Sequence, residues 1–119
     1  MHMKVLICVA VLAFSASASA ASPNCDGVDN WASNMAFVHL KNAGLTDNDK
    51  VKWDERKVVR IASEKIGKDL YRQVHQVTFR EKSGNTIQVI TVNDASHDEC
   101  SMSGVDVYVV SKHLGDHDH

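Results

Sequence analysis

The chain has 119 residues, of which 13 are Lys or Arg and 15 are Asp or Glu, so its formal net charge at pH 7 is −2. This length fits one domain with one hydrophobic core. The slight acidic excess argues against nucleic acid or an anionic membrane as the main partner, because both attract strongly basic proteins.

The first 20 residues have the pattern of a secretory signal peptide. Lys4 supplies a positive charge, residues 5–14 form an uninterrupted apolar run, and Ala18-Ser19-Ala20 matches a small-residue cleavage site. The apolar run is about half as long as a membrane-spanning helix, and no lipid-attachment motif is present. We therefore expect cleavage near Ala20 and a soluble exported protein, in the periplasm or the medium, without a membrane anchor.

Cysteine usage fits this compartment. Removing residues 1–20 from the 119 would leave 99 residues and two cysteines, Cys25 and Cys100. Exported proteins with two cysteines usually oxidise them, so we predict one disulfide. A bond that closes a loop of about 75 residues stabilises a protein by about 4 kcal/mol in the chain-entropy model.

After an extended segment at 21–28, residues 30–43 are predicted to form an amphipathic helix. Apolar side chains recur there at the spacing of one helix face: Trp31, Met35 and Val38, with Ala32, Ala36 and Leu40 broadening the stripe. Asp29 or Asn30 can cap the first turn with a side-chain oxygen. Gly44 can adopt the left-handed conformation that often ends a helix.

Four segments after residue 50 have the alternation or the β-branched composition of strands, and turn signals separate them. They are 57–63, 70–82, 86–92 and 105–112. Because no helix lies between them, they predict an antiparallel meander. We therefore predict an α+β fold in a single domain at 29–112. One N-terminal helix would pack on a four-stranded antiparallel sheet as a two-layer sandwich, helix then β-meander.

This order of one helix followed by four strands resembles the cystatin-type arrangement. The chain lacks a Gln-x-Val-x-Gly loop, so the resemblance concerns architecture alone. Architecture does not imply function, which must be argued from individual residues.

The longest predicted loop, at 93–104, joins the last two strands and is the main candidate binding site. Its ionisable side chains are Asp94, His97, Asp98 and Glu99. A loop of about a dozen residues is often functional. Adjacent side chains rarely converge on one metal ion, and one histidine among carboxylates is no transition-metal signature. The alternating carboxylate pattern of a calcium loop is absent as well.

We therefore predict that this loop is a solvated recognition loop, which the bond between Cys25 and Cys100 would staple to the helix entrance. We also predict that Tyr108, in the last predicted strand, contacts the partner, because aromatic side chains are enriched in protein–protein interfaces. The sequence contains no G-x-S-x-G, H-E-x-x-H or glycine-rich phosphate motif, so we expect neither an enzyme nor a cofactor.

The leading interpretation is a small exported protein-binding module of the inhibitor or immunity type. It would use loop 93–104 and a sheet edge to bind another protein. The alternative is a periplasmic metal-binding protein that uses the polar tail at 113–119, because alternating histidines can bind Zn²⁺, Ni²⁺ or Cu²⁺. The histidines of that tail are His113, His117 and His119.

Overall fold

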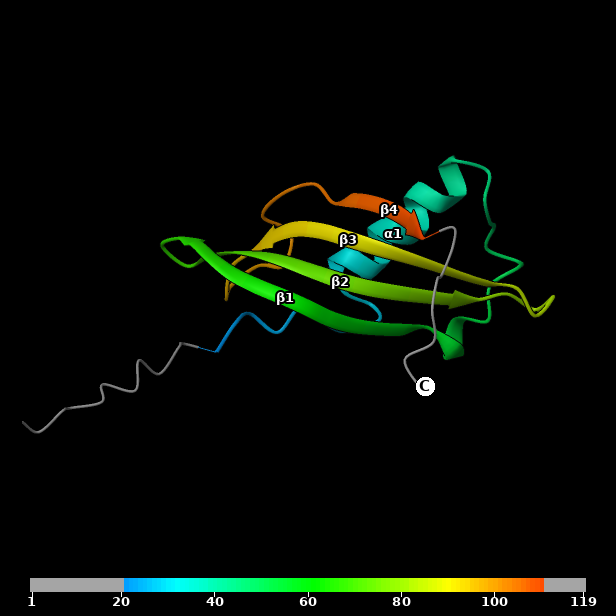
Figure 1. Ribbon diagram of the computed structural model, residues 1–119, viewed down its shortest axis with the longest axis horizontal. Coiled ribbons are helices and arrows are strands. Elements are labelled where there is room, and N and C mark those ends of the chain that lie inside the picture. The colour runs from blue at the N-terminus through cyan, green and yellow to red at the C-terminus, as the bar shows by residue number, and fades with distance from the viewer. Residues whose placement is uncertain (1–20, 111–119) are drawn as a thin grey trace, which may run out of the picture.

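The computed structural model describes residues 21–110 and has an α+β fold, as predicted. Its elements are α1 at Trp31–Asn42, the short 3-10 helix η1 at Trp53–Glu55, β1 at Lys57–Gly67, β2 at Leu70–Arg80, β3 at Thr86–Ala95 and β4 at Asp106–Val110. The four strands form one antiparallel sheet in the order β1-β2-β3-β4 (Figure 1). The signal peptide predicted at 1–20 and the tail at 113–119 lie outside the described residues.

The predicted cap at the start of α1 is wrong. Asn30 occupies the N-cap position, but its side chain makes no capping hydrogen bond. Asp29 instead pairs with Arg56, at 3.1 Å between its Oδ1 and Nη2. The Asp29 carbonyl accepts a 2.8 Å hydrogen bond from the side chain of Asn34. The acidic residue therefore ties the helix entrance to the segment that precedes β1.

The helix α1 ends just before Gly44, as predicted from the sequence. Gly44 has φ of +73°, a left-handed conformation that a side chain would strain. The N–H of Leu45 donates to the Leu40 carbonyl at 2.9 Å, and the N–H of Gly44 donates to the Lys41 carbonyl at 3.0 Å. These two bonds form a Schellman motif and satisfy carbonyls that the helix itself leaves free.

One face of the sheet, called here the inner face, packs against α1, which contacts β2 and β3 (Figure 1). The residues that meet between helix and sheet are Ala36, Phe37, Leu40, Val51, Val77, Phe79 and Val89. In β2 the side chains that point inward and are buried are Tyr71, Gln73, His75, Val77 and Phe79. Burial of each large apolar side chain stabilises the fold by about 1.5–3 kcal/mol.

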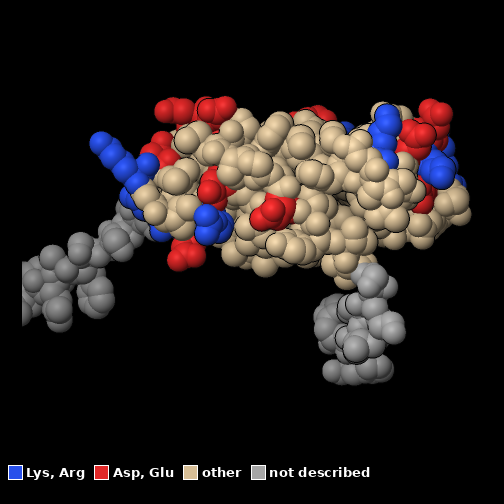
Figure 2. Space-filling view, turned by 90° about the horizontal axis from the view of Figure 1, so that it is seen from above, with Lys and Arg blue, Asp and Glu red and all other residues tan. Residues whose placement is uncertain are grey.

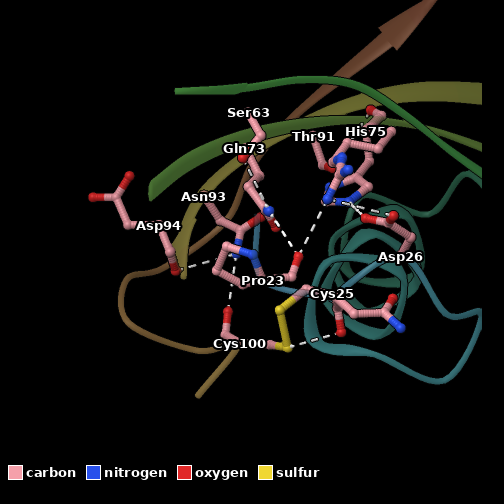
Figure 3. A network of polar contacts seen from close by, with 12 residues as sticks. Pro23, Cys25, Asp26, Ser63, Gln73, His75, Thr91, Asn93, Asp94 and Cys100 are labelled. Atoms are coloured by element: carbon pink, nitrogen blue, oxygen red, sulfur yellow. Dashed lines mark hydrogen bonds and ion pairs between the residues drawn. A yellow bond between two sulfur atoms is a disulfide. The ribbon is translucent and has the colours of Figure 1, made fainter. Parts of the chain in front are cut away.

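The inner face changes from apolar to polar along β2 and β3. Beyond the helix it presents buried polar side chains: Gln73, His75, Thr91 and Asn93. The N-terminal segment at 21–28 covers this polar half in place of α1 (Figure 3). The segment contains no helix or strand.

β3 is longer than the sequence analysis predicted. It continues to Ala95, so Asn93, Asp94 and Ala95 belong to the strand and not to the loop. Asn93 pairs with Gln73 of β2 in the ladder. The connection to β4 therefore begins at Ser96, three residues later than predicted.

Candidate binding surface

The connection between β3 and β4 is held to the N-terminal segment by the predicted disulfide. Cys25 and Cys100 are bonded, with their Cα atoms 5.6 Å apart. The loop also closes on itself, because the N–H of Ser96 donates to the Glu99 carbonyl at 2.7 Å. The Ser101 hydroxyl donates to the Glu99 carboxylate at 2.8 Å. These bonds make the loop compact.

Asp94, one of the predicted partner-binding residues, is engaged within the protein. It lies opposite Arg72 in the ladder between β2 and β3, and Arg72 Nε donates to its Oδ1 at 3.1 Å. This carboxylate raises the pKa of the Arg72 guanidinium. The Asp94 N–H donates to the Ser103 hydroxyl at 2.8 Å. The residue therefore joins two strands and the loop.

His97 is also used internally. Its ring contacts the Asp69 carboxylate through Nδ1 and the Ala21 carbonyl through Nε2, and its N–H donates to the same carboxylate at 3.1 Å. Both ring partners are acceptors, so both ring nitrogens donate, which requires the protonated imidazolium. The Ala21 carbonyl and the Asp69 carboxylate raise the pKa of His97. His97 in turn lowers the pKa of Asp69.

His97 therefore anchors the loop at two places. Asp69 belongs to the turn between β1 and β2 and has a positive φ of 45°, which aspartate tolerates better than most residues. The imidazole also packs edge-on against Tyr71, with ring centroids 5.4 Å apart. The loop, the turn and the first described residue, Ala21, are thus linked by one side chain.

The remaining predicted partner-binding residues point to solvent but do not form one cluster. Asp98 and Glu99 are exposed on the loop. Tyr108 is 59% exposed and pairs with Ile90, within the ladder of β3 and β4. The structure therefore brings Asp98 and Glu99 together and places Tyr108 separately, on the edge strand.

Sequence reasoning missed a groove between α1 and β4, called here the α1–β4 groove. It consists of a hollow of about 690 Å³ and a second of about 360 Å³, which share His39, Val105 and Asp106. The helix contributes Met35, His39 and Ala43, which recur every four residues. The strand contributes Val105, Val107 and Val109, which recur every two. Each spacing alone could have been noticed, but only the structure places the two faces side by side.

A polar network beneath the N-terminal segment was missed as well (Figure 3). His75, fully buried, lies with Nε2 2.8 Å from Asp26 Oδ1. The Gln73 amide donates to the Pro23 carbonyl at 3.0 Å. The Asn93 amide donates to the Cys100 carbonyl at 3.1 Å, beside the disulfide. These bonds fix the segment that carries the staple.

Among residues 21–110, no group of three or more His, Cys, Asp or Glu side chains is arranged to hold a metal ion. The alternative ligands His113, His117 and His119 lie outside that range. No helix in the described part of the chain is long and apolar enough to cross a membrane.

Comparison with protein-family models, curated proteins and solved structures found no match.

Proposed function

We propose that the protein is a small exported module of the inhibitor or immunity type, which binds another protein along β4 and the adjoining loop. The observation that carries the proposal is the edge strand β4, which no other strand of residues 21–110 pairs with on its outer side. Tyr108 and Val109 project to opposite faces of β4 and are 59% and 47% exposed. Edge strands of monomeric proteins are normally covered by other segments or protected by charged side chains. An exposed apolar edge strand therefore indicates a site at which another protein binds.

The loop supports the proposal because it is held in place before any partner arrives. The disulfide, the contact of His97 with Asp69, and the hydrogen bond from the Asp94 N–H to the Ser103 hydroxyl all restrain it. Asp98 and Glu99 are left exposed on this restrained loop. A preorganised loop loses less conformational entropy on binding, which favours affinity.

The proposal includes a two-layer arrangement in which α1 covers β2 and β3 and leaves the β4 side open. It also includes a domain at 29–112 and export after cleavage near Ala20, which would make Ala21 the first residue of the mature chain. A disulfide is consistent with an oxidising compartment. The activity proposed is binding and not catalysis, and it needs no cofactor.

Affinity capture from exported fractions tests the proposal. The bait is used as wild type, as Tyr108→Lys, and as the double variant Asp98→Asn with Glu99→Gln. Val59→Lys is the matched control, since Val59 is 51% exposed on the opposite edge strand β1. We expect a protein retained by wild type and by the control, and reduced with both other baits. Equal capture by all four baits would reject this surface.

A further inference from the structure

We infer that a second copy of this chain binds along β4, so that the two sheets join edge to edge across a two-fold axis. The inference rests on the geometry of the edge and does not depend on the identity of the partner proposed above. Three observations carry it: the difference between the two edges of the sheet, the open groove beside β4, and the self-complementary sequence of β4.

The two edges of the sheet differ in how well they resist pairing. β1 carries four charged residues along its length: Lys57, Arg60, Glu64 and Lys65. Its pairing with β2 also shifts register twice, between Arg60 and Ala62 and between Lys65 and Gly67. Charges and bulges are the usual protection of an edge. β4 carries one charge, Asp106, and pairs with β3 without a shift.

Both faces of β4 have room for an added strand. On the outer face, Tyr108 and Val110 are exposed. On the inner face, Val107 and Val109 line the α1–β4 groove. Because α1 packs over β2 and β3, a strand beside β4 could bury side chains on both faces at once. Such burial would give the association the apolar area that hydrogen bonds alone do not supply.

The β4 strand of a second copy can pair with β4 of the first. Antiparallel pairing that is symmetric about Tyr108 uses all five residues of the strand, Asp106–Val110. Tyr108 then faces Tyr108 of the second copy, Val107 faces Val109, and Asp106 faces Val110. Residues directly opposite share a face, so the inner and outer faces of both copies stay continuous.

Charge does not oppose this pairing. The two Asp106 carboxylates lie at opposite ends of the paired strands, each across from a valine. Figure 2, seen from the side of β4 and α1, shows charged residues gathered toward the two ends of the molecule and a mostly uncharged centre. A neutral centre lacks the like-charge repulsion that would disfavour self-association.

A strand edge accepts one neighbour, so the second copy and any partner on β4 exclude one another. The dimer would then hide the apolar edge until a partner of higher affinity displaces the second copy. Substitutions in the α1–β4 groove that weaken the dimer, but do not alter residues in contact with the partner, would leave β4 free to bind the partner more often.

Sedimentation velocity of the 119-residue protein, from micromolar to sub-millimolar concentrations, tests the inference. Wild type is compared with Tyr108→Lys, Val109→Lys and the β1 control Val59→Lys, and circular dichroism verifies that each is folded. We expect a dimer for wild type and for the control. Both β4 variants should weaken dimerisation about tenfold or more, because each adds a charge to the edge that becomes buried.

A cross-linking experiment tests the register. Tyr108→Cys should form an intermolecular disulfide readily, since residues directly opposite in neighbouring strands have Cβ atoms about 4.5–5.5 Å apart. Val59→Cys should not. A wild type that stays monomeric at every concentration overturns the inference but leaves the proposed partner binding standing. A dimer that resists both β4 variants, is broken by Val59→Lys, or fails to cross-link through Tyr108→Cys also overturns it.

Discussion

Removing the disulfide should destabilise the protein strongly. The perturbation is the double substitution Cys25→Ala and Cys100→Ala. The bond joins residues 75 apart in sequence and thereby encloses α1, β1, β2 and β3 in one covalent loop. Alanine keeps the buried Cys25 position apolar, so the change is mainly the loss of the covalent link.

The magnitude follows from the length of that loop. Closing a loop of this length removes unfolded-state entropy worth about 4 kcal/mol. A small domain is stable by only about 5–15 kcal/mol, so this is a large share of the total. For a domain of about 100 residues, the melting temperature should fall by roughly 15–30 °C. Release of the N-terminal segment from Gln73 and His75 would add to the loss.

The assay is urea unfolding followed by circular dichroism, for wild type and the double variant, with and without reductant. Reductant should bring wild type to the stability of the variant and leave the variant unchanged. If the double variant loses less than about 1 kcal/mol, the reasoning is refuted, because non-covalent contacts would then hold the loop as firmly as the bond.

Three further predictions concern the core, the helix end and pH. Val77→Asp should cost about 4 kcal/mol or more, because it buries an unpaired charge under α1, whereas Thr78→Asp on the outer face should cost far less; denaturant unfolding compares them. Gly44→Ala should cost about 1 kcal/mol in the same assay, because alanine must adopt the positive φ; an unchanged midpoint would count against the Schellman motif. The contact of His97 with Asp69 should stabilise fully between pH 3.8 and pH 6.5, the ordinary pKa values of an aspartate and a histidine side chain. Since the folded pKa of His97 is raised and that of Asp69 is lowered, the contribution is lost as pH rises through the folded pKa of His97 or falls through that of Asp69. Asp69→Asn should reduce the dependence of melting temperature on pH near neutrality, although the Ala21 carbonyl still raises the pKa of His97, and an unaltered profile would count against the contact of His97 with Asp69.

The sequence predicted the number and order of the elements because each depends on local spacing. The predicted limits of α1 agree with the structure to within one residue, but its buried side includes Ala36, Phe37 and Leu40, and Val38 of the predicted apolar face is 40% exposed. β1 continues to Gly67, four residues beyond its predicted end at 63.

The start of the long loop was misplaced for a physical reason. Asn93 and Asp94 are turn-forming residues, yet they extend β3 because Gln73 and Arg72 of β2 pair with them. Tertiary pairing overrides local propensity there.

The candidate site was predicted less well, because its partners are distant in sequence. Asp94 and Arg72 are 22 residues apart, and His97 and Asp69 are 28 apart. From the sequence all four are simply polar residues near turns or strand ends. Because of these pairings, Asp94 and His97, which were expected to contact a partner, instead make contacts within the protein that hold the loop. The α1–β4 groove was hidden for a similar reason, since it depends on which strands the helix covers.

The most direct test of the central claim, that β4 and its loop form the binding surface, is the affinity of the captured partner for three forms of the protein. Isothermal titration calorimetry would compare wild type with Tyr108→Lys and Val59→Lys. We predict that Tyr108→Lys weakens binding by about thirtyfold or more, the loss expected when a central interface residue is changed. Val59→Lys should leave the dissociation constant unchanged. Equal affinities for all three forms, or a loss with Val59→Lys alone, would contradict the claim.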